Sequence, residues 1–247
     1  GNVLVSGGSP VVRNSIVCAQ IECALANHFP VVVLHEGNYL LEENVRSRFS
    51  PSGRYAEIGF QSPAFEPMYG LSGLEISNEI VQAAAKDFDM KFIVKYYMEG
   101  LTAFMSKLGK ATSFHMFATC PHMTLFDKVD DAQMKGRISD TEAQEIKSKL
   151  MMGQSESMKL ESVLANFQME TDQLLWKRGN AASPVNVYSA IKEQRILCFD
   201  LVAVSNRLLM NMIIFQLKLA LTKGLPYVLV IDSLPANCNE QYQEFLK

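Results

Sequence analysis

The chain has 247 residues, of which 48% are hydrophobic and 20% charged, and its formal net charge is −3. This hydrophobic content is typical of a folded domain with a sizeable core and excludes an intrinsically disordered chain. The slightly acidic balance excludes a protein that is basic overall, so contact with DNA would depend on a local basic patch.

The cysteines and histidines give no sign of a metal site or a disulfide framework. The five cysteines form no C-x-x-C pair, and the four histidines are scattered along the chain. We therefore expect reduced, buried thiols in a cytoplasmic protein rather than a zinc centre. The sequence contains no apolar run of about 18 residues, so it predicts no transmembrane helix.

The first 40 residues predict a strand, a helix and a second strand. A short apolar strand at 3–6, a Gly-Gly turn and a helix at 14–28 are followed by an apolar run at 31–34. Asn14 or Ser15 is the expected N-cap of the helix. The second run is typical of a parallel strand buried on both faces, and together the three elements predict a right-handed βαβ unit.

The rest of the chain alternates strand and helix patterns around a helix-rich middle. Apolar runs and helical periodicity predict strands at 55–60, 195–200 and 227–231, and helices at 37–49, 74–88, 91–108, 187–194 and 204–222. Residues 126–179 carry mixed charge and many helix formers, with a cap signature at Ser139 and Glu142, which predicts a small all-helical insertion. The expected fold is α/β, with a mostly parallel sheet flanked by helices in a core formed by 1–125 and 180–247.

The segment after the first strand has the outline of a phosphate-binding loop without its full set of residues. A P-loop reads G-x-x-x-x-G-K-[ST], in which a strand turns through glycines into a helix N-terminus. Counted from Gly8, Arg13 replaces the second glycine and Asn14 the lysine, while Ser15 keeps the hydroxyl. Counting from Gly7 instead keeps Arg13 as a cation but loses the hydroxyl. The sequence therefore predicts a degenerate phosphate-binding loop.

The last predicted strand ends like the second half of a nucleotide site. The apolar run at 227–231 leads into Asp232, as in a Walker B strand, where the aspartate holds the shell of a Mg²⁺ ion. A glutamate that activates water often follows that aspartate, but here Ser233 stands in its place. Loss of one group that stabilises developing charge costs roughly 10²-fold or more in rate, so we do not expect efficient hydrolysis.

The order of these pieces resembles the nucleotide-binding domain of the HerA/FtsK-like ATPases, and most of all the TraG-type coupling proteins of conjugative and type IV secretion systems. The matching pieces are VLVSGGSPVVRNS, FEPMYGLSGLEISNEIVQAA, RILCFDLVAVSNRLLMNMIIFQLKLAL and YVLVIDSLP. In that family the last piece carries Asp-Glu, often followed by Leu-Pro, and this chain keeps Asp232, Leu234 and Pro235. The resemblance implies a RecA-like P-loop core with a helical insertion.

The resemblance also implies cofactors and partners. ATP and Mg²⁺ are the implied ligands, and a degenerate site that binds neither is the alternative. The implied partners are other subunits or components of a DNA-transfer or secretion machine, including further copies of the chain, because related ATPases form hexamers. Direct DNA contact stays open, since no basic patch is evident. The chain stops a few residues after Asp232, so we expect a fragment of a longer protein, whose membrane anchoring also stays open.

We expect a bound phosphate to face the glycine turn and the start of the helix. The candidate residues for this role are Gly7, Gly8, Ser9, Arg13, Asn14 and Ser15. Ser15 and Asp232 are the candidate metal ligands, and no residue is assigned a catalytic role. The loop residues Phe65, Glu66 and Pro67 either line this site or, as the favoured alternative, hold Phe65 in the core.

Three functions follow from these residues. The first is a degenerate P-loop domain that serves assembly or interaction within a DNA-transfer or secretion machine. The second is a working NTPase in which Arg13 replaces the lysine. The third is an unrelated α/β protein that binds a dinucleotide or another small molecule and whose Gly7-Gly8 turn only imitates a P-loop.

Overall fold

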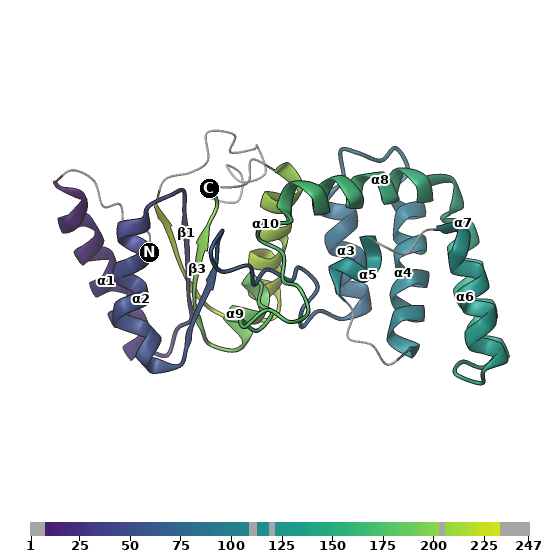
Figure 1. Cartoon of the computed structure of the whole chain (residues 1–247), viewed down its shortest axis with the longest axis horizontal. Helices are drawn as coiled ribbons and strands as arrows, with labels where there is room; N and C mark the ends of the chain where they lie inside the picture. Colours follow the sequence, from purple (N-terminus) through teal and green to yellow (C-terminus); the bar gives the residue numbers. More distant parts are fainter. Residues whose placement is uncertain (1–7, 109–112, 119–121, 203–205, 233–247) are drawn as a thin grey trace. The chain divides into compact units, whose positions relative to one another are not determined.

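The chain forms two compact units. The computed structural model describes residues 8–108, 113–118, 122–202 and 206–232. The first unit, called the sheet unit below, comprises Gly1–Phe65, Gln173–Ser205 and Gln216–Lys247. The second, called the helical unit, comprises Glu66–Asp172 and Asn206–Phe215 (Figure 1).

The sheet unit is built on parallel strands. Its described strands are β1 (Val31–His35), β2 (Tyr55–Ile58), β3 (Ile196–Asp200) and β4 (Val228–Asp232), in the order β2-β3-β1-β4. All neighbouring pairs in this four-stranded sheet are parallel. Every residue of β1 and β3 is buried, as the continuous apolar runs predict for strands covered on both faces. The predicted α/β fold with a parallel sheet flanked by helices is thereby confirmed.

Helices cover both faces of this sheet. Helices α1 (Pro10–Ala26) and α2 (Tyr39–Phe49) lie on one face, and the short α9 (Val187–Lys192) lies on the other (Figure 1). The core on the first face is formed by Cys18, Ile21, Ala24, Val31, Val33, Leu41, Val45, Phe49, Ile196 and Cys198. Alternate strand residues point to the opposite face, where the ring centroids of Phe199 and Phe65 lie 5.4 Å apart.

The strand order creates a switch point between β1 and β3. The chain leaves β1 and crosses over β3 to reach β2, whereas it leaves β3 and crosses over β1 to reach β4. The two connections therefore leave neighbouring strands in opposite directions along the sheet. In open parallel sheets, such a reversal of direction marks the crevice at the carboxyl ends of the strands in which these folds bind their ligands.

The first helix begins earlier than predicted. Helix α1 starts at Pro10, and Ser9 is its N-cap, with the Ser9 hydroxyl accepting a hydrogen bond from the amide of Val12 at 3.4 Å. The prediction that Asn14 or Ser15 caps this helix is therefore wrong. A serine followed by proline at the first helical position is a strong start signal. The predicted strand at 3–6 lies outside the described residues.

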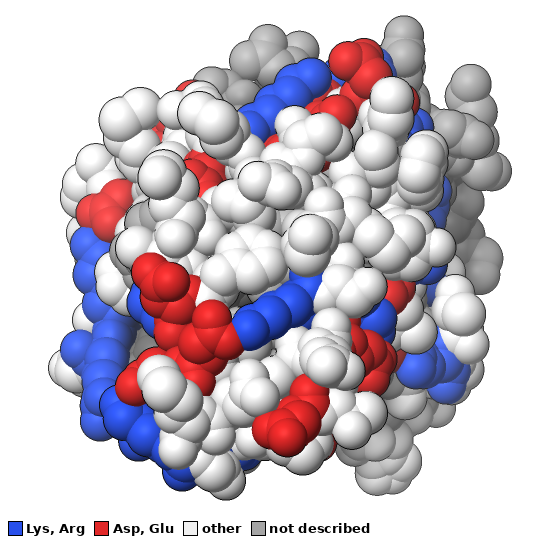
Figure 2. Space-filling view, turned by 90° about the vertical axis from the view of Figure 1, so that its right-hand side faces the viewer, with Lys and Arg blue, Asp and Glu red and all other residues white. Residues whose placement is uncertain are grey.

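The helical unit contains six complete helices among its described residues. These are α3 (Gly73–Ala83), α4 (Lys91–Lys107), α5 (Phe114–Ala118), α6 (His122–Met134), α7 (Asp140–Met152) and α8 (Gln154–Thr171). The predicted cap of α7 is confirmed as a full capping box between Ser139 and Glu142. The face in Figure 2 carries acidic and basic side chains interspersed among uncharged ones. The insertion expected at 126–179 falls within this unit as far as residue 172.

Helix α10 (Arg207–Thr222) is mostly apolar, and its polar residues Arg207, Asn211 and Gln216 form hydrogen bonds with other parts of the chain. In the helical unit, the Arg207 guanidinium bonds both carboxylate oxygens of Asp87 at 2.7 Å, and the Asn211 amide donates to the carbonyl of Ala83 at 2.7 Å. In the sheet unit, the Gln216 side-chain oxygen accepts a bond from the amide of Val187 at 3.0 Å. No helix within the described ranges is both long and apolar enough to cross a membrane.

A substitution at Gly153, between α7 and α8, tests how closely this connection packs against α4 in the helical unit. A Cβ atom at Gly153 would lie 2.2 Å from the Cβ and 2.8 Å from the Cα of Tyr97 on α4. We expect Gly153→Ala to destabilise the protein by about 3 kcal/mol or more, because the backbone of α4 must move. Gly136→Ala is the control: its φ of +65° is strained but no atom lies within 4 Å, so we expect a loss of about 1–2 kcal/mol. Urea unfolding measures both, and equal losses would contradict the close contact.

Candidate functional site

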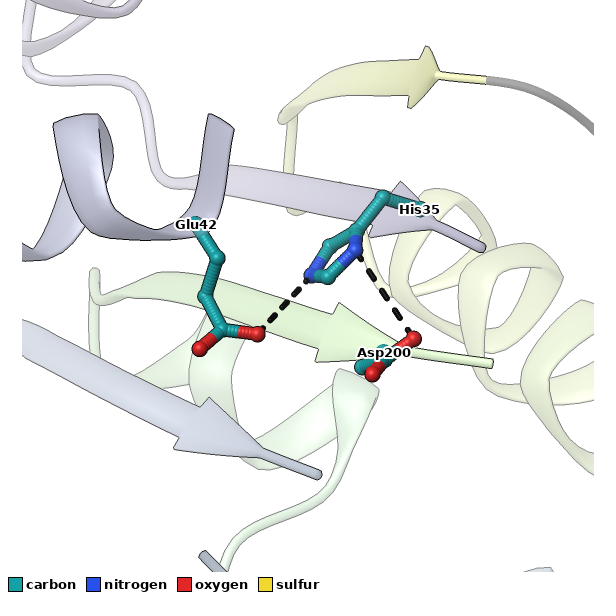
Figure 3. Close-up of side chains that lie close together, drawn as sticks. All are labelled: His35, Glu42 and Asp200. Atoms are coloured by element: carbon teal, nitrogen blue, oxygen red, sulfur yellow. Dashed lines mark ion pairs between the residues drawn. The ribbon is translucent and has the colours of Figure 1, made fainter. Parts of the chain in front are cut away.

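Three ionisable side chains meet at the switch point of the sheet. His35 ends β1, Asp200 ends the neighbouring β3 opposite it, and Glu42 lies in the first turn of α2. Figure 3 shows the His35 ring between the two carboxylates, with Nε2 at 3.6 Å from an oxygen of Glu42 and Nδ1 at 3.8 Å from an oxygen of Asp200. His35 has no exposed surface and Asp200 is 3% exposed. The fold therefore buries a histidine and two acids together.

The short connection between β1 and α2 fixes Asp200. Oxygen Oδ1 of Asp200 accepts hydrogen bonds from the amides of Gly37 at 3.0 Å and Val202 at 2.9 Å. Gly37 has a φ of +67°, and a Cβ atom there would lie 3.1 Å from a methyl group of Val202. Glycine is thus required by both conformation and space. As a result the Asp200 carboxylate is held in place by two backbone N–H groups.

Asp232 lies at the same edge on the other side of His35. It is the last residue of β4 and is paired in register with His35. Its Oδ2 accepts a hydrogen bond of 2.7 Å from the side-chain amide of Asn38. The oxygen of that amide caps α2 by accepting a bond of 3.0 Å from the amide of Leu41. The aspartate singled out in the sequence therefore does end a parallel strand at the carboxyl edge.

Arg46 of α2 forms ion pairs with three neighbouring acids, one of which, Glu42, belongs to the cluster. It pairs with Glu42, with Glu43 at 2.7 Å and with Glu57 of β2 at 2.8 Å. Burial alone would raise the pKa of Glu57, but hydrogen bonds from Arg46, Tyr55 and Ser62 outweigh it and lower that pKa. Glu57 is therefore held as a carboxylate in a saturated network.

Burial controls the charge state of the other two groups. It lowers the pKa of His35 in spite of the opposing effects of Asp200 and Asp232. Burial also raises the pKa of Glu42, reinforced by the charge of Glu57 and opposed by Arg46. A neutral imidazole has one nitrogen lone pair available to a ligand. Among the described residues, neither ring nitrogen of His35 has a hydrogen-bond partner.

An open pocket adjoins this cluster. It has a volume of about 400 Å³ and shares Glu42 and Asp200 with the cluster. The pocket is lined by Tyr39, Glu42, Glu43, Arg46, Glu57, Gly59, Phe60, Gln61 and Asp200. The side chains of Tyr39 and Phe60 are each 61% exposed. Four acids and one arginine make the lining negative, which suits a cation or a positively charged group.

Three of the six predicted phosphate-site residues, Arg13, Asn14 and Ser15, lie inside helix α1. Gly7 falls outside the described residues, and Ser9 is the N-cap. The Arg13 guanidinium donates to the carbonyl of Gly8 at 2.8 Å, and the Ser15 hydroxyl donates to the carbonyl of Val11 at 2.9 Å. Asn14, the residue in the lysine position, is only 2% exposed, and its amide nitrogen has no partner in the described part of the chain.

The loop after β2 places its aromatic residue in the core. Phe65 has no exposed surface and forms backbone bridges with Leu175 and Val185. The favoured alternative for this residue, a core position, is thereby confirmed. In the helical unit, Pro67 is buried, and a Glu66 oxygen accepts hydrogen bonds from the amides of Phe114 at 2.8 Å and Met68 at 3.3 Å.

Sequence reasoning missed His35, Glu42 and Asp200 as a group. Each has a local signal, since His35 and Asp200 directly follow apolar runs and Glu42 opens a helix. Their proximity depends on which strands are neighbours and in which register, and local patterns do not carry that information. Comparison of the chain with protein-family models, curated proteins and solved structures gave no significant match.

Glu66 predicts a pH dependence of stability in the helical unit. Burial raises its pKa from 4.5 to about 7, although the two amide bonds oppose the shift. The folded state holds the proton more tightly, so the stabilisation is complete below pH 4.5 and is lost as the pH rises through 7. We expect Glu66→Gln to remove up to about 3 kcal/mol of this pH dependence.

Denaturant unfolding between pH 5 and pH 8 measures the effect. The control is Glu145→Gln, which changes a carboxylate that is 66% exposed on α7 and should leave the pH profile of the wild-type protein unaltered. A Glu66→Gln profile that parallels the wild-type profile would show that the Glu66 carboxyl does not hold a proton in the folded state.

Proposed function

We propose that the chain is a degenerate nucleotide-binding domain of the DNA-transfer or secretion coupling type. In this proposal the domain serves assembly or interaction within a larger machine, binds ATP and Mg²⁺ weakly or not at all, and does not hydrolyse ATP efficiently. The proposal combines the resemblance of the quoted segments with the geometry of the sheet unit.

The observation that carries the proposal is the position of Asp232. It ends β4 at the carboxyl edge, and β4 pairs with the central strand β1. Figure 1 shows α1 beginning at the edge at which the strands end, and α1 packs on β1 and β4. A helix N-terminus and a strand-ending aspartate at one edge are the two halves of a nucleotide site, which supports a nucleotide-binding ancestry.

The same geometry supports weak chemistry. Helix α1 already begins at Pro10, so the residues from Pro10 onward offer helical amides rather than a loop that surrounds phosphate oxygens. Asn14 carries no charge and is buried, and the Arg13 guanidinium is bonded to the carbonyl of Gly8. The uncharged Asn14 and the engaged Arg13 therefore leave the site without two charged contacts to the phosphates. Each loss costs roughly 10²-fold in rate, which lowers an ordinary turnover of about 1–100 s⁻¹ to about 10⁻² s⁻¹ or less.

Repair of the loop tests this proposal. We expect the double variant Arg13→Gly, Asn14→Lys, which restores G-x-x-x-x-G-K-S, to bind a fluorescent ATP analogue with Mg²⁺ at least about tenfold more tightly than the wild-type protein. The reason is that a hydrogen bond to a charged group contributes about 1.5–3 kcal/mol. The added change Asp232→Asn should remove the gain, because Asp232 would hold the metal.

Arg13→Gly alone is the matched control, since it introduces the glycine without supplying a cation. Circular dichroism verifies that each variant is folded. A folded double variant that binds ATP no better than Arg13→Gly would contradict a P-loop ancestry. Wild-type turnover near 1 s⁻¹ that Arg13→Ala and Asp232→Ala abolish would show instead that the chain is a working NTPase.

A second candidate is an unrelated α/β protein that binds a small molecule at the switch point. The pocket of about 400 Å³ beside Glu42 and Asp200 favours it, because parallel sheets bind ligands where their connections diverge. The exposed rings of Tyr39 and Phe60 could stack on a ligand, and the acidic lining favours a positive group. Failure of the loop repair together with ligand binding that Tyr39→Ala weakens would support this candidate.

A further inference from the structure

The side chain of His35 lacks a hydrogen-bond partner among the described residues. Its ring is fully buried, and its closest carboxylate oxygens, at 3.6 Å on Glu42 and 3.8 Å on Asp200, lie beyond the 2.7–3.2 Å of an ordinary hydrogen bond. Neither ring nitrogen has a hydrogen-bond partner in the parts of the chain that the structure describes. Buried polar groups are rarely left unpaired, and an exception points to an ion or a ligand.

Acidic side chains surround the ring in the part of the chain that the structure describes. Glu42 and Asp200 flank it, and Asp232 and Glu57 are close enough to affect its ionisation. Arg46 already bonds Glu42, Glu43 and Glu57. The bonds that Asp200 accepts come from two backbone amides, which carry no net charge. A cation between the carboxylates would supply both the missing partner and a compensating positive charge.

We propose that His35, Glu42 and Asp200 bind one divalent transition-metal ion. One nitrogen of the histidine and one oxygen of each acid all lie within 4.8 Å of one another. Ligands placed at about 2.0–2.2 Å around a tetrahedral Zn²⁺ ion are separated by about 3.4 Å, so the ligand atoms must come closer to one another by at most about 1.4 Å. Only one ring nitrogen can bond to the ion.

The ligand set indicates the kind of metal. Mg²⁺ and Ca²⁺ prefer sites made of oxygen alone, whereas an imidazole with two carboxylates suits Zn²⁺, Mn²⁺ or Fe²⁺. Three protein ligands leave a coordination position for water or a ligand, as in catalytic rather than structural metal sites. Since Glu42 and Asp200 also line the pocket, we place this position on the side of the pocket. The site does not depend on the function proposed above.

Titration of the chelator-treated protein tests the site. Isothermal calorimetry with ZnCl₂ and with MnCl₂ should show one ion per chain, and Glu42→Gln should weaken binding at least about tenfold, the effect typical even of groups that only support a metal ligand. Glu22→Gln, which changes a carboxylate that is 56% exposed on α1, is the control and should bind like the wild-type protein. No binding, or equal affinity of the Glu42→Gln and wild-type proteins, overturns the proposal.

A second variant keeps the test decisive if Glu42→Gln disturbs α2. His35→Leu removes the two unpaired nitrogens and keeps an apolar side chain in the same place. Without metal it should melt no lower than the wild-type protein. Saturating Zn²⁺ should raise the melting temperature of the wild-type protein but not that of His35→Leu, because only the former binds the ion. Equal Zn²⁺ stabilisation of both proteins would assign the ion to another place and contradict the site.

Discussion

The parallel pairing of β1 with both β3 and β4 is the constraint on which the rest of the sheet unit depends. It places His35 between Asp200 and Asp232 at one edge. The connections leaving β1 and β3 run in opposite directions along the sheet, the arrangement at which open parallel sheets commonly bind ligands. The apolar strand interiors hold these strands together, and the polar side chains gather where the apolar runs stop.

This arrangement places ionisable groups in a buried environment, which disfavours their charged forms. Asp200 is stabilised by two backbone amides and Asp232 by Asn38, so each carboxylate at the strand ends has specific donors. For His35, the described residues supply no such partner. An unpaired buried polar group costs about 1–3 kcal/mol. Sites that bind a ligand commonly violate a folding rule in this way, because the missing partner is the ligand itself.

Local patterns were sufficient for most elements of the fold. The runs VVVL and ILCF predicted buried parallel strands because a strand covered on both faces has no polar alternation. The start of α1 was predicted wrongly because the Gly-Gly turn suggested a longer loop, although Ser9 and Pro10 carried the opposite signal. The polar residues at the carboxyl edge fall into two sets, Asp232 and the group of His35, Glu42 and Asp200. Asp232 could be singled out from the sequence because it follows an apolar strand. The group of His35, Glu42 and Asp200 could not, because it depends on strand order and register.

The most direct test of this account is diffraction from crystals of the wild-type protein soaked in Zn²⁺, with data collected above the zinc absorption edge. The account predicts one strong anomalous peak at the carboxyl edge, within about 2.0–2.2 Å of a ring nitrogen of His35 and of oxygens of Glu42 and Asp200. It would be contradicted by a map without a peak at this place in which both ring nitrogens of His35 are hydrogen-bonded to other groups of the protein.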